Sequence, residues 1–271
     1  MGGSVPRISV CLPVRNGEAY LGDALASVQR QAGADIIVMA SNNNSQDRTA
    51  AILDAWSTKI NMTVVTQPAL LGMWDHFNSL LERVATPYFM VLCHDDFLNA
   101  PDALAKAAHI LDSEPAITAV YCDLAYVNTH GKPLMARRFR RTGLLPAELL
   151  GQQSLASGRN MFGIPLLVRT SCLGDKRYDA RMTYISDIDL SWRISAGGLV
   201  HHVPEALIAN RYSGYNTTWT VMRGAEREFR LLAQKRGIKL SNLQLLRLKA
   251  LNWVVMQQRK IFGIYARIRT K

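Results

Sequence analysis

The chain has 271 residues, 48% of them hydrophobic, so it can bury one large core, with or without an appendage. Its formal net charge of +11 would suit a nucleic-acid-binding protein, but residues 225–271 hold 12 Lys and Arg against 2 Asp and Glu, which leaves +1 for all the rest. A near-neutral body without interleaved aromatic and basic residues argues against that class, and no nucleic-acid partner is expected.

The four cysteines lie in or beside apolar runs, and no C-x-x-C pair is present, which argues against a zinc or redox centre. They are Cys11, Cys93, Cys122 and Cys172. We expect them to be reduced, as in a cytoplasmic protein. The sequence shows no basic segment followed by an apolar leader, and this also favours a cytoplasmic location.

Strands alternate with helices along the first part of the chain. Short apolar, β-branched runs bounded by turn residues predict the strands, and apolar residues at helical spacing predict the helices. The predicted strands are 8–14, 35–41, 61–67 and 88–93, and the predicted helices are 18–31, 47–56 and 74–85. This alternation predicts an α/β fold with a mostly parallel sheet covered by helices on both faces.

Polar residues follow three of the predicted strands directly: Asn16, Asn43 and Asp95. Ligands of open parallel sheets bind beyond the carboxyl ends of the strands, so these residues should surround one crevice. Loops after strands are commonly polar for structural reasons alone. Three such loops at the same edge favour a binding site.

Two adjacent carboxylates, Asp95 and Asp96, follow the predicted strand 88–93. One of them could cap the next helix, predicted at 101–111, because Asp is a common N-cap residue. The second then adds electrostatic repulsion at a strand end unless a cation offsets both charges. Carboxylate oxygens suit Mg²⁺ or Mn²⁺, and such ions commonly bridge protein carboxylates to substrate phosphates.

Three segments, 8–31, 41–49 and 72–101, resemble the glycosyltransferase family 2 enzymes of the GT-A fold, and the resemblance covers about residues 7–215. They read ISVCLPVRNGEAYLGDALASVQRQ, SNNNSQDRT and GMWDHFNSLLERVATPYFMVLCHDDFLNAP. Arg15 stands where the family usually has tyrosine, Asn42 replaces an aspartate, and Cys93 occupies the first position of the D-x-D metal motif. A histidine that often follows the domain is missing near 210–217, NRYSGYNT.

The resemblance implies a site for a nucleotide-diphosphate sugar donor with a divalent metal, Mn²⁺ or Mg²⁺, held by Asp95 and Asp96. It implies donor contacts at Pro13, Arg15, Asn16, Glu18, Asn42, Asn43 and Asp95.

The segment 184–195, YISDIDLSWRIS, has the pattern of an amphipathic helix that Ser186 or Asp187 would cap. Packing alone would explain this pattern. The segment also resembles the family's E-D-x-D-L-x-x-R motif, with Ser186 in place of the glutamate. That resemblance implies that Asp187 is the catalytic base. Between this motif and the acid pair, we expect Arg159 and Arg169 to be solvated.

The resemblance implies an inverting glycosyltransferase that moves a sugar to a glycan or lipid-linked acceptor in cell-surface polysaccharide or glycolipid synthesis. A non-catalytic relative that binds sugar nucleotides is one alternative. A sugar-phosphate nucleotidyltransferase is another, but it would need a Gly-rich loop after the first strand, and Arg15-Asn16-Gly17 does not provide one.

We expect two parts of the chain: a glycosyltransferase domain at 1–220 and a basic amphipathic helical extension at 221–271. Apolar residues keep helical spacing in the extension, at Leu248, Leu251, Val255, Phe262 and Tyr265. Its charge-free run, 250–258, is too short to span a bilayer. The helix could lie on an anionic membrane surface, which would make the protein peripheral on the inner face of the membrane, or pack on the domain with a solvated basic face. The sequence leaves both alternatives open.

Overall fold

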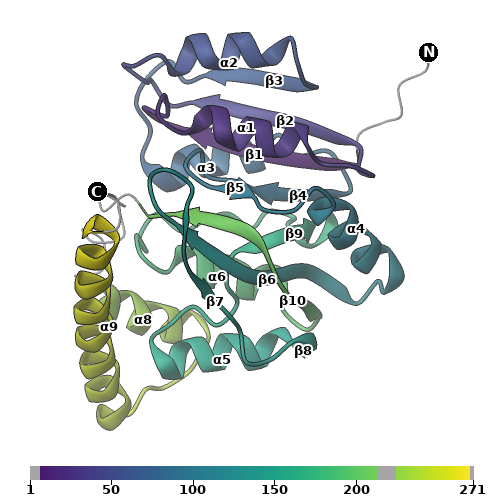
Figure 1. Ribbon diagram of the computed structural model, residues 1–271. Helices are drawn as coiled ribbons and strands as arrows, with labels where there is room; N and C mark the ends of the chain where they lie inside the picture. The colour runs from purple at the N-terminus through teal and green to yellow at the C-terminus, as the bar shows by residue number, and fades with distance from the viewer. Residues whose placement is uncertain (1–6, 213–223, 269–271) are drawn as a thin grey trace.

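In the part of the chain that the structure describes, ten strands form a mixed sheet with helices on both of its faces (Figure 1). The computed structural model describes residues 7–212 and 224–268. The strands are β1 (Ile8–Val14), β2 (Ile36–Asn42), β3 (Met62–Thr66), β4 (Tyr88–Val91), β5 (Phe97–Leu98), β6 (Ile117–Val127), β7 (Pro133–Arg137), β8 (Gly143–Pro146), β9 (Pro165–Arg169) and β10 (Leu199–Arg211).

Helices alternate with the early strands and follow the later ones. They are α1 (Leu21–Gln29), α2 (Thr49–Ser57), α3 (Met73–Leu81), α4 (Ala103–Ser113), α5 (Ala147–Ser157), α6 (Ser186–Ile194), α8 (Ala225–Lys235), α9 (Asn242–Ile268) and the short 3₁₀ helix η1 (Thr170–Cys172). Among the described residues, no helix is both long and apolar enough to cross a membrane.

The strand order is β3-β2-β1-β4-β9-β6-β10-β5, with β7 beside β6 and β8 beside β10. The pairs among β3, β2, β1 and β4 are parallel, as is β6 with β10. This confirms the predicted α/β fold with a mostly parallel sheet. β9 runs antiparallel to both of its neighbours, β4 and β6, an orientation that the sequence did not predict. Through β9, the parallel strands of the first half join the long strands of the second.

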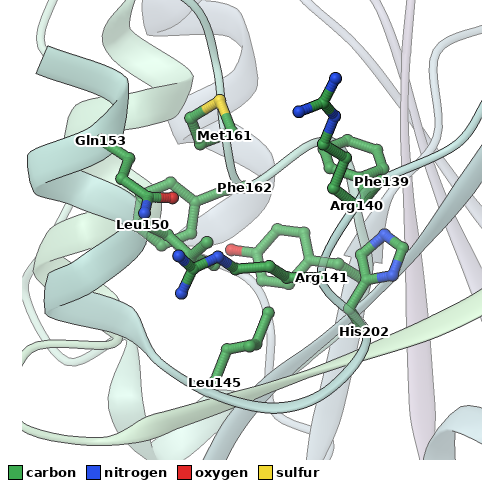
Figure 2. A pocket seen from close by; sticks show the side chains of 10 residues that line it. Phe139, Arg140, Arg141, Leu145, Leu150, Gln153, Met161, Phe162 and His202 are labelled. Atoms are coloured by element: carbon green, nitrogen blue, oxygen red, sulfur yellow. The ribbon is translucent and has the colours of Figure 1, made fainter. Parts of the chain in front are cut away.

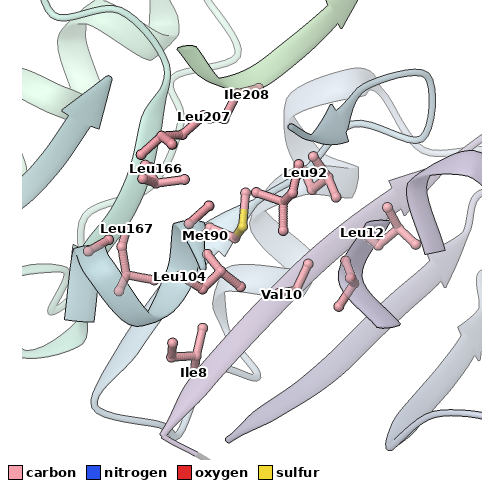
Figure 3. Packing of buried hydrophobic residues seen from close by; sticks show 14 of the residues in the cluster. Ile8, Val10, Leu12, Met90, Leu92, Leu104, Leu166, Leu167, Leu207 and Ile208 are labelled. Atoms are coloured by element: carbon pink, nitrogen blue, oxygen red, sulfur yellow. The ribbon is translucent and has the colours of Figure 1, made fainter. Parts of the chain in front are cut away.

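Apolar side chains form a separate core on each face of the sheet. The first core packs the sheet against α1, α2 and α4, and Figure 3 shows Val10 and Leu12 of β1 beside Met90 of β4 and Leu104 of α4. The second core packs the opposite face against α5, α6 and α8. β1 is buried along its whole length because it lies between β2 and β4 with helices on both sides. Fully burying one Leu or Ile side chain contributes about 1.5–3 kcal/mol to folding.

Two alternatives that the sequence left open are not observed. Neither Asp95 nor Asp96 caps the following helix, because α4 begins at Ala103 and its N-cap residue is Asp102. The N-cap residue of α6 is Ile185, so Ser186 and Asp187 lie inside its first turn.

The prediction of a solvated Arg169 was wrong, because its half-buried guanidinium is bound to backbone carbonyls. It donates hydrogen bonds to the carbonyl oxygens of Ile117 at 3.0 Å and Leu111 at 2.6 Å. Arg169 therefore ties the end of β9 to the connection between α4 and β6, a contact between segments that are distant in sequence.

Candidate active site

The loops that follow β1, β2 and β3 contact one another at the carboxyl edge of the sheet. Asn43 is buried, and its side chain exchanges two hydrogen bonds with the backbone of Leu71, at 2.9 and 3.0 Å. Its backbone N–H also donates to the Val14 carbonyl at 2.8 Å. Asn43 therefore joins the three loops. This role is structural, whereas the family resemblance implies that Asn43 contacts the nucleotide-sugar donor.

The loops after β1 and β2 are connected by the side chains of Asn16 and Glu18. The Asn16 side-chain oxygen accepts a hydrogen bond from Gln46 N at 2.9 Å, and a Glu18 carboxylate oxygen accepts one from Arg48 N at 3.0 Å. Asn16 has a φ of 48°, a left-handed conformation that Asn tolerates better than most residues. These oxygens hold the shape of the loop 45–48, while both residues remain exposed at the edge of the crevice.

The other predicted donor residues of these loops differ in exposure. Pro13 is buried beside Ser41 in the β1–β2 pair, whereas Arg15 is exposed. Asn42 is buried at the end of β2, where its side-chain oxygen accepts a hydrogen bond from Ser45 N at 3.1 Å. Arg15 is therefore the one of these three whose side chain reaches the surface of the crevice.

The acid pair lies just beyond β4, and Cys93 lies with it. One ligand atom from each of Cys93, Asp95 and Asp96 falls within 4.8 Å of the other two. Asp96 is buried, and it accepts hydrogen bonds from Asn210 Nδ2 at 2.6 Å and from Arg211 N at 3.0 Å. Burial, and then the charge of Asp95, raises the pKa of Asp96 well above its usual range. Burial, Asp96 and Asp95 likewise raise the pKa of the Cys93 thiol.

A buried arginine at the end of β10 holds this group in place. The Arg211 side chain is 1% exposed, and it donates to the Asp95 carbonyl at 3.1 Å and to the Thr129 carbonyl at 2.8 Å. It also pairs with the Asp23 carboxylate of α1 at 2.7 Å. Sequence reasoning missed Arg211, because an arginine after an apolar strand gives no signal that distinguishes a buried from a solvated side chain.

Asp187 begins the second group of polar residues, on the first turn of α6. It is half-buried, and its carboxylate accepts a hydrogen bond from Asn160 Nδ2 at 2.9 Å. The Asn160 side-chain oxygen accepts from the N–H groups of Phe162 and Gly163, which fixes the amide with its donor toward Asp187. Sequence reasoning missed Asn160 too, since no motif links it to α6.

The start of α6 is held by α8. Glu228 is buried, and its carboxylate accepts hydrogen bonds from the N–H groups of Thr183, Tyr184 and Ile185 at 2.8–3.0 Å. These N–H groups precede the helix that lacks a side-chain cap of its own.

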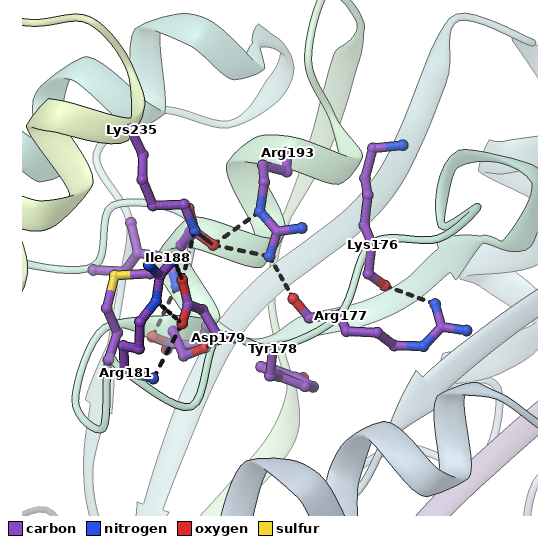
Figure 4. A network of polar contacts seen from close by, with 12 residues as sticks. Lys176, Arg177, Tyr178, Asp179, Arg181, Ile188, Arg193 and Lys235 are labelled. Atoms are coloured by element: carbon purple, nitrogen blue, oxygen red, sulfur yellow. Dashed lines mark hydrogen bonds and ion pairs between the residues drawn. The ribbon is translucent and has the colours of Figure 1, made fainter.

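Salt bridges also connect α8 to α6 and to the segment before it. Lys235 of α8 pairs with Asp179 at 2.9 Å and with Asp189 of α6 at 2.8 Å, and Arg193 also pairs with Asp189 (Figure 4). The hydrogen bond from Arg181, more than any other contact, lowers the pKa of Asp179. The helix that carries Asp187 is thus fixed at its first turn by α8.

Tyr178 lies in the segment before α6 and packs against α3. Its ring stacks on Trp74 of α3 with centroids 4.5 Å apart, and Asn78 bonds its backbone at 2.8 and 3.0 Å. Burial raises the pKa of Tyr178, and the charges of Asp187 and Cys93 raise it further. Tyr178 therefore joins α3 to the segment that leads into α6.

Comparison with known proteins agrees with this arrangement. A family model described as glycosyl transferase family 2 matches residues 9–178. The chain belongs to glycosyltransferase family 2. This family 2 enzyme is therefore a glycosyltransferase, which argues against the sugar-phosphate nucleotidyltransferase alternative. The matched range contains the acid pair but ends before Asp187, so the role of that residue is a separate question.

Relatives and solved structures are similar to this family 2 chain at low identity. An uncharacterised glycosyltransferase of Rickettsia typhi is 25% identical over 228 residues, covering 82% of this chain and 69% of the relative. The abequosyltransferase RfbV of Salmonella typhimurium is 31% identical over 114 residues, 41% of this chain and 34% of the relative.

Two solved structures share the fold. TarS 1–349 of S. aureus has a TM-score of 0.63 at 17% identity, covering 91% of this chain and 70% of that one. The mannosyltransferase PcManGT of Pyrobaculum calidifontis, in complex with GDP-Man and Mn²⁺, has a TM-score of 0.60 at 14% identity, covering 96% and 74%. These likenesses establish the GT-A fold predicted from the sequence.

Replacing Arg211 with Lys should lower the free energy of unfolding by about 1–3 kcal/mol, because an ammonium group cannot replace a guanidinium that contacts several segments, and buried acceptors lose their donor. Urea denaturation measures the effect. Arg30→Lys is the control, since Arg30 is exposed at the end of α1. Equal stability of Arg211→Lys and the wild type would contradict the structural role of Arg211.

Proposed function

We propose that this family 2 enzyme transfers a sugar, with inversion, from a nucleotide-diphosphate donor to a glycan or lipid-linked acceptor in the synthesis of a cell-surface polysaccharide or glycolipid. The main support is the family match over residues 9–178, together with the group of Cys93, Asp95 and Asp96 that lies just beyond β4. TarS structures contain UDP or UDP-GlcNAc, and the PcManGT complex contains GDP-Man, which supports a nucleotide-sugar donor for this chain.

The donor site that we propose is the crevice beyond β1, β2 and β4. Arg15, Asn16 and Glu18 are exposed there, and the buried Pro13, Asn42 and Asn43 support the loops from beneath. Because Asn16 and Glu18 already bond the loop 45–48, their contribution to the donor site includes holding that loop. Arg15 is free of such a role in the described contacts and can approach a phosphate.

Asp95 fits a divalent metal ion better than its neighbours do. Its carboxylate is half-buried at the crevice, whereas Asp96 already accepts two hydrogen bonds from β10. The oxygen ligand suits Mg²⁺ or Mn²⁺, while the Cys93 sulfur is softer than Mg²⁺ prefers. We therefore propose Asp95 as the principal ligand, with Asp96 orienting the turn. A bound ion would offset the negative charge on the departing diphosphate.

Asp187 is the proposed catalytic base. An acceptor hydroxyl loses its proton as it attacks the anomeric carbon, and a positioned carboxylate promotes that step about 10²–10⁴-fold. The Asn160 amide holds the Asp187 carboxylate in a fixed orientation, and Glu228 holds the turn before it. In a single displacement the acceptor attacks opposite the leaving diphosphate, so the configuration at the anomeric carbon inverts.

The division of the chain at about residue 220 remains a proposal, with α8 and α9 forming the extension 221–271. α8 is not detached from the body, because Phe229 and Leu232 are fully buried in the second core. In α9, Leu248 is buried and Leu251 is half-buried, so this side of the helix packs inward. The side chains of Val255, Phe262 and Tyr265, predicted on the same stripe, lie outside the described residues.

A different face of α9 supports the membrane proposal. Its exposed apolar residues are Leu243, Leu246, Trp253, Val254 and Ile261. They fall on one side of a helix with 3.6 residues per turn, and the exposed Arg247, Lys249 and Lys260 occupy its two flanks. An apolar face with a tryptophan and flanking basic residues suits an anionic lipid surface. We propose that this face docks peripherally on the cytoplasmic side of a membrane.

Asp187→Asn should keep nucleotide binding and reduce transfer by about 10²–10⁴-fold, because the amide has nearly the shape of the carboxylate but cannot take a proton. Release of nucleoside diphosphate from a panel of donors measures turnover, and calorimetry with UDP and GDP measures binding. Asp175→Asn is the matched control, since Asp175 is exposed before α6. Near-normal turnover by Asp187→Asn would refute the assignment of the base.

Asp95→Ala should weaken Mn²⁺ binding and metal-dependent nucleotide binding by about ten-fold or more, because it removes an oxygen ligand. Calorimetric titration with MnCl₂, with and without UDP or GDP, measures both effects. Asp102→Ala is the control, because Asp102 is exposed at the start of α4. If the wild type retains full turnover after exhaustive chelation, the metal proposal is wrong.

Replacing Leu246 and Trp253 together with Gln should reduce binding to anionic phospholipid vesicles by about ten-fold or more, because both exposed side chains would leave the membrane interface. Vesicle sedimentation at increasing salt measures the binding, which should weaken as salt screens the basic flanks. Leu70→Gln is the control, because Leu70 is also an exposed leucine but is far in sequence from α9. Unchanged vesicle binding by the double variant would refute this membrane face. Neither Leu246 nor Trp253 is buried, so their replacement does not expose the hydrophobic core and should leave the protein folded.

A further inference from the structure

A pocket of about 180 Å³ lies between α5, β8, β10 and the segment 139–141 (Figure 2). Its walls are largely apolar and include Tyr121, Phe139, Leu145, Leu150, Met161 and Phe162. A cavity of about 150 Å³ in another protein holds benzene, so this volume suits a group of about one ring in size. Three aromatic rings in the walls favour a flat or unsaturated occupant.

One buried polar side chain in the pocket lacks a hydrogen-bond partner. His202 of β10 is 3% exposed, and within the described part of the chain neither of its ring nitrogens makes a hydrogen bond. Its Nε2 is 3.7 Å from the Asp123 carboxylate, and its ring packs on Phe139 with centroids 4.6 Å apart. Leaving a buried polar group unsatisfied costs about 1–3 kcal/mol, and a ligand with a polar atom at this position would recover part of that cost.

Positive charge lies over the same pocket. Arg140 and Arg141 both line it, and both are exposed. In Figure 2 the side chain of Arg141 extends across the pocket toward the side of Gln153 and Leu150, whereas the guanidinium of Arg140 points away. A guanidinium binds phosphate or carboxylate through paired hydrogen bonds, so Arg141 suits an anionic substituent on the occupant.

The pocket adjoins the residue that we propose as the base. Met161 and Phe162 of its wall directly follow Asn160, whose amide donates to Asp187 at 2.9 Å. On another wall, Tyr121 packs in the second core together with apolar residues of α6, the helix that carries Asp187. The segment 160–162 therefore contributes both to the wall of the pocket and to the orientation of the proposed base.

We propose that this pocket binds the non-sugar part of the acceptor, a small apolar group of about one ring in size that carries a phosphate or a carboxylate. The assignment to the acceptor rests on the proposed function, because it depends on Asp187 being the base. Arg141 contacts the anion, the aromatic walls enclose the apolar group, and His202 bonds a polar atom of the ligand.

Phenyl phosphate and benzoate are the probes of this pocket, with inorganic phosphate and benzyl alcohol as partial ligands. NMR of the protein with ¹³C-methyl-labelled methionine follows the binding, since Met161 lines the pocket and Met90 is buried in the first core on the opposite face of the sheet. We expect saturable shifts of the Met161 methyl signal with phenyl phosphate or benzoate, weaker binding of both partial ligands, and no shift of Met90. The tighter of the two probes identifies the anion as phosphate or carboxylate.

Arg141→Gln should weaken the tighter probe by about ten-fold or more, because a charge-assisted contact is lost. Arg138→Gln is the matched control, since Arg138 is exposed in the same segment and does not line the pocket. Leu145→Trp should fill the pocket and abolish binding, and it provides a second test in case Arg141 contributes only long-range attraction.

The outcomes separate this proposal from the proposed function. No shift of Met161 with either probe at millimolar concentration, in a protein that still binds UDP or GDP, would overturn the pocket assignment and leave the glycosyltransferase proposal standing. Equal binding by wild type, Arg141→Gln and Leu145→Trp would also overturn it. Phenyl phosphate or benzoate should in addition inhibit sugar transfer without inhibiting donor hydrolysis. If the probes bind at Met161 but leave transfer unaffected, the assignment to the acceptor is wrong.

Discussion

The buried guanidinium of Arg211 is the contact on which the placement of the acid group depends. Removing such a cation from water costs several kcal/mol unless its donors are paired, so the surrounding segments must supply acceptors in fixed positions. They come from α1, from the turn before Asp96 and from the turn after β6. Because the Arg211 backbone also donates to Asp96, the end of β10 and the acid pair are held as one unit. The positive charge offsets part of the repulsion between the two carboxylates, and the metal ion that we propose would offset more.

The position of Asp187, the proposed base, depends on hydrogen bonds to the start of α6 rather than on a buried cation. α6 begins without a side-chain cap of its own, and the carboxylate of Glu228 satisfies the N–H groups that precede it. This contact crosses from α8, so the extension beyond residue 220 contributes to the position of Asp187. The extension therefore has two roles in our proposal: α8 fixes the helix of the base, and α9 presents an apolar face toward a membrane.

The strand β9 explains how the two sides come together. It runs antiparallel between β4, which leads to the acid pair, and β6, which leads to Arg211's partners near Thr129. The segment just before β9 contains Asn160 and the wall of the pocket, so the orientation of Asp187 and the shape of the pocket share one loop. A substrate that occupies the pocket could thus affect the base through that loop. The arrangement suits an enzyme that must bring a charged donor and a partly apolar acceptor to the same point.

The sequence by itself determined the alternating α/β pattern, the position of the acid pair after a buried strand and the helical character of both 184–195 and the tail. These features follow from local patterns of apolar residues and turn residues, which act over a few positions in the chain. It also placed Asn16, Asn43 and Asp95 at one edge, because the geometry of a parallel sheet leaves little choice. The family resemblance, rather than any local pattern, singled out Asp187.

Only the tertiary structure decided which polar residues hold these groups in place. Asn160, Arg211 and Glu228 each act across a large distance in sequence, on Asp187, the acid pair and the start of α6 respectively. The burial of Leu248 and the exposure of Leu246 on the same helix likewise depend on where α9 packs, not on their similar side chains. A side chain's own chemistry sets which contacts it can make, but burial and long-range partners determine which of them it does make, and both arise only when distant segments of the chain come together.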